Sequence, residues 1–272
     1  MLKSLTKIFA SKPKARMPAV PDGTRYYVIG DIHGRLDLFE AIIDAVEQDD
    51  AAAGPAETHV ILLGDLVDRG PDSAGVLART REWQKRRNVR VLAGNHEEMF
   101  LESFEKEEIL RHFLKHGGRE TILSFGLTRK QFNAMTLEEL FALIPQLIPQ
   151  SERDYIASFE DMIVAGDYLF VHAGIDPKVP LDEQRRSDML WIRDRFLNHE
   201  GPLEKVVVHG HTIFDKVMDC GNRIGIDTGA FRSGVLTALV LEGDNKRVIQ
   251  TSDTDGRIAV STAEHEPALT RA

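Results

Sequence analysis

Short apolar runs recur along the chain, and most of them end in a glycine next to a polar residue. The runs span residues 26–29, 60–63, 89–92, 168–171, 206–208, 224–226 and 235–241. Each run is short and rich in valine, isoleucine or leucine, which is typical of strands that are buried inside a sheet. The pattern therefore predicts a series of strands spread over most of the chain.

Helical patterns lie between the first three of these runs. Apolar side chains recur at the spacing of one helix face at Leu36, Phe39, Ile42, Ile43 and Val46. Residues 72–87 predict a second helix, which ends in basic side chains. The order strand, helix, strand, helix, strand implies parallel strands that are joined by right-handed crossovers.

The pattern becomes mostly helical between residues 97 and 158. Thr136 and Glu139 predict a capping box at the start of one helix, and Pro145 is expected to end that helix. Strands return after residue 161, where 162–164 and 168–171 predict a hairpin. We therefore predict an α/β fold in which one sheet-based domain, residues 26–250, carries a helical insert at about 97–158.

The two ends of the chain differ from this domain. Residues 1–25 hold six basic side chains, one acid and three prolines, which predicts a mobile basic arm. Apolar positions in the arm are spaced as on a short helix, so contact with a membrane surface or a partner is the alternative. Residues 251–272 are polar and lack periodicity, and we expect a partly frayed tail there.

Composition narrows the classes of function. The chain has 34 Lys+Arg against 43 Asp+Glu, a formal charge of −9, which argues against a protein that coats nucleic acid. No apolar run approaches the roughly 18 residues of a transmembrane helix, and no secretory signal pattern is found. The single cysteine, Cys220, excludes a disulfide framework and favours a cytoplasmic location.

Side chains of the types that bind metals follow five of the predicted strands. In chain order they are Asp31 and His33; Asp65 and Asp68; Asn95, His96 and Glu97; His172; and His209 and His211. Because parallel strands end at one edge of a sheet, these segments can meet in one crevice. Carboxylate, imidazole and amide ligands suit Mn, Fe or Zn, and the Asp65 carboxylate can bridge two ions about 4 Å apart. We therefore predict a site for two metal ions.

Three of the segments resemble the signature motifs of the calcineurin-like metallophosphoesterases, in the phosphoprotein phosphatase branch. They are residues 30–34 (Gly-Asp-Ile-His-Gly), 64–70 (Gly-Asp-Leu-Val-Asp-Arg-Gly) and 94–97 (Gly-Asn-His-Glu). Residues 172–174 and 210–212 resemble the later ligand motifs, and 116–118 and 226–230 are similar to the small bacterial and phage type. The resemblance covers about residues 26–241 and implies a central β-sandwich flanked by helices.

The resemblance also implies which residues bind the metals. It assigns Asp31, His33 and His211 to one ion, and Asn95 and His172 to the other. Asp65 would bridge the two ions. His209 is expected to lie beside these ligands, with direct metal binding as the alternative. Mn²⁺ is the expected ion, with Fe and Zn as alternatives.

The resemblance also implies which residues take part in catalysis and which bind phosphate. His96 would protonate the leaving oxygen as general acid, and Asp68 would orient it. Arg69 and Asn95 would bind phosphate together with Arg193, for which Arg195 is the rival. Arginine suits this task because its planar fork meets two phosphate oxygens at once.

The implied reaction is hydrolysis of phosphoserine and phosphothreonine, with phosphotyrosine as a further candidate, in proteins or in small phosphoesters. Two cations lower the pKa of a shared water, and the bridging hydroxide attacks phosphorus directly, so no covalent phosphoenzyme is expected. A sister branch with the same core hydrolyses dinucleoside polyphosphates, and symmetrical cleavage of diadenosine tetraphosphate is the alternative. Asp68 and Glu97 favour the phosphatase branch. The oligomeric state is left open by the sequence.

Overall fold

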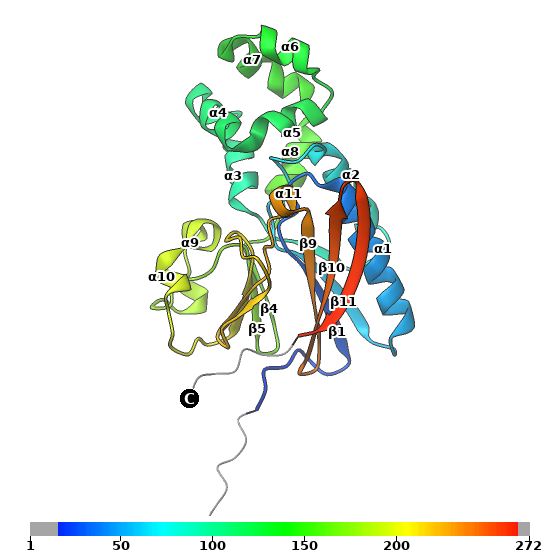
Figure 1. Ribbon diagram of the computed structural model, residues 1–272. Helices are drawn as coiled ribbons and strands as arrows, with labels where there is room; N and C mark the ends of the chain where they lie inside the picture. The colour runs from blue at the N-terminus through cyan, green and yellow to red at the C-terminus, as the bar shows by residue number, and fades with distance from the viewer. Residues whose placement is uncertain (1–15, 266–272) are drawn as a thin grey trace, which may run out of the picture.

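The computed structural model describes residues 16–265 as two β-sheets packed face to face, with helices on both outer sides (Figure 1). This confirms the predicted α/β class and the β-sandwich implied by the resemblance. The basic positions of the predicted arm up to Lys14, and the last seven residues of the predicted tail, lie outside the described residues. Within the described range, no helix is both long and apolar enough to cross a membrane.

The first sheet has six strands in the order β11-β10-β9-β1-β2-β3. Its parallel half comprises β1 (Thr24–Ile29), β2 (Glu57–Leu62) and β3 (Val89–Val91). The predicted helices α1 (Leu36–Ala52) and α2 (Ser73–Gln84) connect these strands. The antiparallel half comprises β9 (Val235–Glu242), β10 (Asn245–Thr254) and β11 (Arg257–Glu264).

The second sheet has five strands in the order β4-β5-β6-β8-β7. They are β4 (Met162–Ala165), β5 (Tyr168–Val171), β6 (Val206–His209), β7 (Met218–Asp219) and β8 (Arg223–Gly225). The predicted hairpin is confirmed, because β4 and β5 pair antiparallel. Strands β5, β6 and β8 run parallel, so their carboxyl ends share one edge of the sheet.

Apolar side chains fill three layers. Val28, Leu239, Phe170 and Val208 belong to the cluster that packs between the two sheets. The outer face of the first sheet packs against α1, α2 and the helical segment that follows β3. The outer face of the second sheet packs against α9 (Arg186–Trp191) and α10 (Asp194–Leu197).

The predicted helical insert lies between β3 and β4. It contains α3 (Asn95–Glu102), α4 (Glu107–Phe113), a π-helical turn (Leu114–Gly118), α5 (Arg119–Ser124), α6 (Arg129–Ala134), α7 (Leu137–Leu147) and α8 (Gln150–Ala157). These helices rise above one end of the sandwich (Figure 1). The Thr136–Glu139 capping box is confirmed. The expected stop at Pro145 is wrong: α7 runs to Leu147, because Ile144 and Ile148 are buried and the Ile148 N–H bonds to the Ile144 carbonyl.

The prediction of a frayed tail from residue 251 is also wrong. Strand β10 continues to Thr254, and β11 then pairs with it over eight residues. Asp255 and Gly256 form the turn between them, and both have positive φ, as a type I′ hairpin requires. The polar character of the segment comes from its place at the edge of the sheet, where β11 is exposed to solvent.

The domain starts earlier than expected, since β1 begins at Thr24 and its second residue is buried. The Arg25 guanidinium donates to Glu242, at 2.8 and 2.9 Å, and to Asp50, at 2.8 Å. Val20 is also buried, and its N–H bonds to the Gly243 carbonyl. Residues 19–25 thus belong to the folded domain.

Candidate active site

The loops at the carboxyl ends of five strands bring the predicted residues together. Asp31 and His33 follow β1, Asp65 and Asp68 follow β2, and His172 and His211 follow β5 and β6. Asn95 and His96 open helix α3, directly after β3. All eight side chains are buried, at 8 % exposure or less. The crevice expected from the strand order is therefore formed by residues far apart in the sequence.

The backbone of this site is strained where the functional side chains leave it. Six non-glycine residues in the described range have φ in the left-handed region, and five are candidate site residues. They are His33, Asp65, Asp68, Arg69 and His211. Such conformations cost roughly 1–3 kcal/mol each and persist where the surrounding structure enforces them. Gly210 has no room for a side chain, because a Cβ there would lie 2.0 Å from an Asp31 carboxylate oxygen.

The candidate metal ligands form two groups that share Asp65. In each group one ligand atom per residue lies within 4.8 Å of the others. One group is His33, Asp65 and His96, and the other is Asp65, His172 and His211. The structure thus places His211 with His172, whereas the resemblance assigned it with His33. Its backbone N–H still donates to both Asp31 oxygens, at 3.0 and 3.2 Å. Asp65 occupies the shared position that a bridging ligand needs.

Lone pairs converge in the second group. His172 donates its Nδ1 proton to the Leu63 carbonyl at 2.8 Å, so a neutral ring presents an acceptor at Nε2. That Nε2 lies 2.9 Å from Asn95 Oδ1 and 3.5 Å from Asp65 Oδ1. The buried Nε2 of His211 has no hydrogen-bond partner among the residues that the structure describes. Acceptors that face one another in this way fit a cation between them.

Electrostatics supports the same interpretation. Burial, together with the charges of Asp227 and Asp65, raises the pKa of Asp31 well above its usual range. Burial lowers the pKa of His33, His172 and His211, the last to about 2, so these rings are neutral, as metal binding requires. A cluster of carboxylates and neutral imidazoles that is removed from water is stabilised by bound cations.

His96, which belongs to the first group by distance, also forms a buried pair with Asp68. The Nδ1 of His96 lies 2.6 Å from Asp68 Oδ2, and Thr121 on α5 donates to the other oxygen at 2.6 Å. Burial alone would lower the pKa of His96, but Asp65 and Asp68 outweigh it and the pKa is raised. The Nε2 atom of His96 faces the cluster. Its position and its raised pKa suit a proton donor to a leaving group.

Arg69 reaches into the space between the two histidines. Its guanidinium donates to Nε2 of His33 at 2.7 Å and to Nε2 of His96 at 2.8 Å. Its guanidinium carbon lies 4.6 Å from the centre of the Phe231 ring. Gly117 packs against it from the insert, and its carbonyl accepts from the Arg69 N–H at 3.1 Å. The side chain is thus held from both sides at the mouth of the site.

Four residues near the site were assigned no metal-binding, catalytic or phosphate-binding role from the sequence. Glu97 caps the Asp65 loop, with its oxygens accepting from the backbone N–H groups of Gly94, Asp65 and Leu66 at 2.8 Å. Thr121 and Phe231 act on Asp68 and Arg69 as described above. Asp227 adds negative charge next to Asp31, and burial raises its own pKa to about 6. The acid in motif 226–230 was a signal for Asp227, but no local pattern marks Thr121.

The remaining candidate residues, Arg193, Arg195 and His209, differ in their contacts. Arg193 is exposed, and its Nη1 lies 3.5 Å from Thr212 Oγ1, next to His211. Arg195 instead pairs with Asp176 at 2.9 Å and Asp188 at 2.6 Å, so its charge is already matched. His209 packs edge-on against Phe196 and lies outside both ligand groups.

Comparisons with known proteins agree with this site. A family model described as calcineurin-like phosphoesterase matches residues 24–228. Serine/threonine-protein phosphatase 1 of Salmonella typhimurium is 30% identical over 217 residues, which cover 78% of this chain and 89% of that protein. A bis(5'-nucleosyl)-tetraphosphatase of the asymmetrical type from Geobacillus thermodenitrificans is 27% identical over 236 residues, covering 78% and 88%.

Solved structures share the fold. A cold-active protein-tyrosine phosphatase from a psychrophilic Shewanella superposes with a TM-score of 0.52 at 17% identity, covering 92% of this chain and 87% of that one. The family match spans most of the domain and every candidate metal ligand. The chain therefore belongs to the calcineurin-like phosphoesterase family.

Proposed function

We propose that this chain is a phosphomonoesterase that uses two metal ions to hydrolyse phosphoserine and phosphothreonine, with phosphotyrosine as a further substrate. The family uses a dinuclear metal site and acts on phosphoesters. The two groups of facing side chains around Asp65 carry the proposal, because they fit two adjacent cations once Asp31 takes the place of His96, the proposed general acid, as a ligand in the first group. Asp31 and Asn95 would complete the ligand set, and the bound ions would supply a nucleophilic water near neutral pH.

The residues around the proposed metal sites would bind the phosphate and protonate the leaving group. Arg69 lies between His33 and His96, and a phosphate that enters there can take over the guanidinium's hydrogen bonds. Arg193 and the Asn95 amide would bind further phosphate oxygens. His96 would then give a proton to the departing alkoxide, which is a poor leaving group without one, while Asp68 holds the ring.

The chemistry of the leaving group supports a phosphomonoester substrate. An alkoxide from serine or threonine needs an acid, and the buried His96–Asp68 pair, at 2.6 Å, supplies one. Relatives named serine/threonine-protein phosphatase and bis(5'-nucleosyl)-tetraphosphatase match the same share of the chain at similar identity. A relative of the symmetrical type also matches 79% of the chain, at 25% identity, so symmetrical hydrolysis of diadenosine tetraphosphate is the second candidate.

A direct competition separates the two candidates. The enzyme with Mn²⁺ is given a phosphoserine peptide and diadenosine tetraphosphate at equal concentration, and phosphate, ADP, ATP and AMP are measured. We expect phosphate from the peptide, and a large loss of activity in the H96N variant. The R195A variant is the matched control for R193A, because Arg195 is engaged by two carboxylates; only R193A should raise KM.

The products decide which proposal stands. ADP as the main product would replace the phosphatase proposal with symmetrical dinucleotide hydrolysis, and ATP with AMP would indicate asymmetrical cleavage. No turnover of either substrate by an enzyme shown to hold two metal ions would reject both.

A further inference from the structure

Strand β11 presents a long open edge at the end of the six-stranded sheet (Figure 1). The other sheet edges are β3, β4 and β7, with three, four and two residues, whereas β11 has eight. Folded proteins protect exposed edges by keeping them short or by adding lysine, proline or a bulge. Strand β11 has neither lysine nor proline, and its register with β10 is unbroken from Arg257 to Glu264. Among residues 16–265, no strand pairs with the outer N–H and C=O groups of β11.

The side chains of β11 are exposed on both faces of the sheet. Ile258 and Val260 are 37 % and 52 % exposed, which is high for β-branched residues in a strand. Val260 and Thr262 face α1, since Thr262 pairs with Ile249, which belongs to the core under that helix. Ala263 pairs with Val248 and faces the second sheet.

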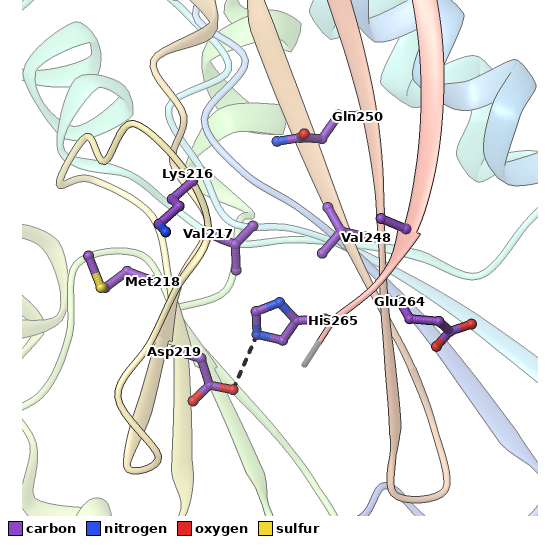
Figure 2. Close-up of a pocket in the computed structure, with 9 residues that line it drawn as sticks. Lys216, Val217, Met218, Asp219, Val248, Gln250, Glu264 and His265 are labelled. Atoms are coloured by element: carbon purple, nitrogen blue, oxygen red, sulfur yellow. Dashed lines mark hydrogen bonds and ion pairs between the residues drawn. The ribbon is translucent and has the colours of Figure 1, made fainter. Parts of the chain in front are cut away.

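A hollow lies on each side of this edge. On the α1 side, a hollow of about 590 Å³ is lined by Val260, Thr262 and six side chains of the helix. The helix contributes both small and polar side chains, namely Ala41, Ala45, Ala52, Asp44, Gln48 and Asp49. On the other side, a hollow of about 440 Å³ lies between β11, β10 and the segment leading into β7, with Met218 and His265 in its lining (Figure 2). A strand added beside β11 would place its side chains in these hollows alternately.

We propose that this added strand is β11 of a second copy of the chain, paired antiparallel about a two-fold axis at Val260. With a two-fold axis perpendicular to the sheet, the sheet face that α1 covers in one copy is continuous with the same face of the other copy. The β11 side chains on the α1 face therefore line up across the interface. Val260 then lies opposite the partner subunit's Val260, and Ile258 opposite the partner subunit's Thr262. Cross-strand pairs of β-branched residues stabilise a sheet.

The charges at the two ends of β11 favour antiparallel pairing of two copies. The chain carries a formal charge of −9, but β11 contains one arginine and one glutamate and so adds no net repulsion between copies. Arg257 and Glu264 lie at opposite ends of the strand, and antiparallel pairing brings the basic end of one copy toward the acidic end of the other. A parallel arrangement would bring like charges together.

The oligomeric state of the full chain tests this proposal. Sedimentation velocity over a range of concentrations is expected to show a dimer for the natural sequence and a monomer for V260K, which opposes two ammonium groups at the axis. V164K is the matched control: Val164 lies on the edge strand β4 with a similar exposure of 51 %, and its change should leave the dimer intact. Circular dichroism establishes that each variant is folded.

A cross-link tests the register independently. In a C220S background, V260C should form a covalent dimer on mild oxidation, because opposite Cβ atoms in an antiparallel pair lie about 4.5–5.5 Å apart, close to disulfide geometry. V164C should not. A monomer at every concentration, or a dimer that survives V260K and gives no V260C cross-link, would overturn the proposal. Neither readout depends on catalysis, because β11 holds no residue of the candidate active site.

Discussion

Arg69 illustrates how single residues at the site depend on neighbours that the motifs do not include. Its position in the second motif was predicted, but its orientation depends on Phe231, which contacts both the guanidinium and the His33 ring. That contact joins two segments more than a hundred residues apart, so no local pattern could have predicted it. The same holds for Thr121, whose hydroxyl reaches Asp68 from the helical insert.

Removal of the Phe231 ring is expected to weaken substrate binding. A cation–π contact contributes about 1 kcal/mol, so F231A should raise KM for a phosphoester, and the inhibition constant of phosphate, by about fivefold. F231Y keeps the aromatic face and should behave like the natural enzyme. A fall in kcat with both of those constants unchanged would show that the ring does not position Arg69.

The metal sites give a second prediction at this scale, with a thermal readout. A ligand that binds only the folded state, and is present at a concentration of about a hundred times its Kd, raises the free energy of unfolding by roughly 2.7 kcal/mol. Chelation should therefore lower the melting temperature and abolish activity, and Mn²⁺ should restore both. D65N removes the carboxylate common to both groups, so its melting temperature should not respond to Mn²⁺. An equal response in D65N would exclude this cluster as the metal site.

At the scale of elements, the helical insert contacts the candidate active site. Its turn at Gly117 has φ of 110°, and a Cβ there would lie 2.6 Å from Arg69 Cγ. Helix α5 supplies Thr121, which donates to Asp68 and accepts from the Asp68 N–H at 2.9 Å. These contacts join the insert to Asp68, the partner of the proposed general acid, and to Arg69, the proposed phosphate clamp.

The contribution of α5 can be measured with one substitution. T121V leaves Oδ1 of the buried Asp68 without its donor, which costs about 1–3 kcal/mol, whereas the Asp68 N–H keeps Ser73 Oγ as its acceptor at 2.9 Å. We expect a lower free energy of unfolding in urea and a fall in kcat with little change in KM. T121S restores the hydroxyl and should recover both. Recovery of stability without recovery of kcat would limit Thr121 to a structural role.

Elements marked by strong local patterns were predicted correctly, and those that depend on distant partners were not. The first three strands, α1, α2 and the Thr136 capping box follow from periodicity and cap residues. Strand β11 was missed although Asp255–Gly256 is a strong hairpin signal and Ile258, Val260 and Thr262 alternate. Its sequence is as polar as that of a frayed tail, because an edge strand exposes both of its faces to water.

At the scale of the whole molecule, a buried ion pair joins the two sheets. Asp219 on β7 accepts from Lys246 Nζ on β10 at 2.8 Å, and His265 after β11 lies 3.3 Å away (Figure 2). Burial would raise the pKa of Asp219, but the bonds from His265 and Lys246 outweigh it and lower the pKa to about 2. The first sheet is thereby tied to the edge of the second.

This pair predicts how stability depends on pH. The folded pKa of Asp219 lies below its unfolded value, so the stabilisation is complete above about pH 4 and is lost as the pH falls toward 2. The shift corresponds to about 2 kcal/mol. Urea unfolding at pH 2, 3, 4 and 6 should show this decline, and D219N should lack that part of it. An unchanged decline in D219N would assign the effect to other carboxylates.

The strand order also determines when the site can form during synthesis. Strand β1 carries the first ligands, yet it pairs with both β2 and β9, and His211 follows β6, late in the chain. A polypeptide that is still being synthesised therefore lacks His211 and the strand β9 that pairs with β1, so neither the ligand set nor the first sheet is complete. Metal ions can bind at the proposed site in its final geometry only after most of the chain has emerged. We therefore expect metal binding to follow synthesis of most of the chain.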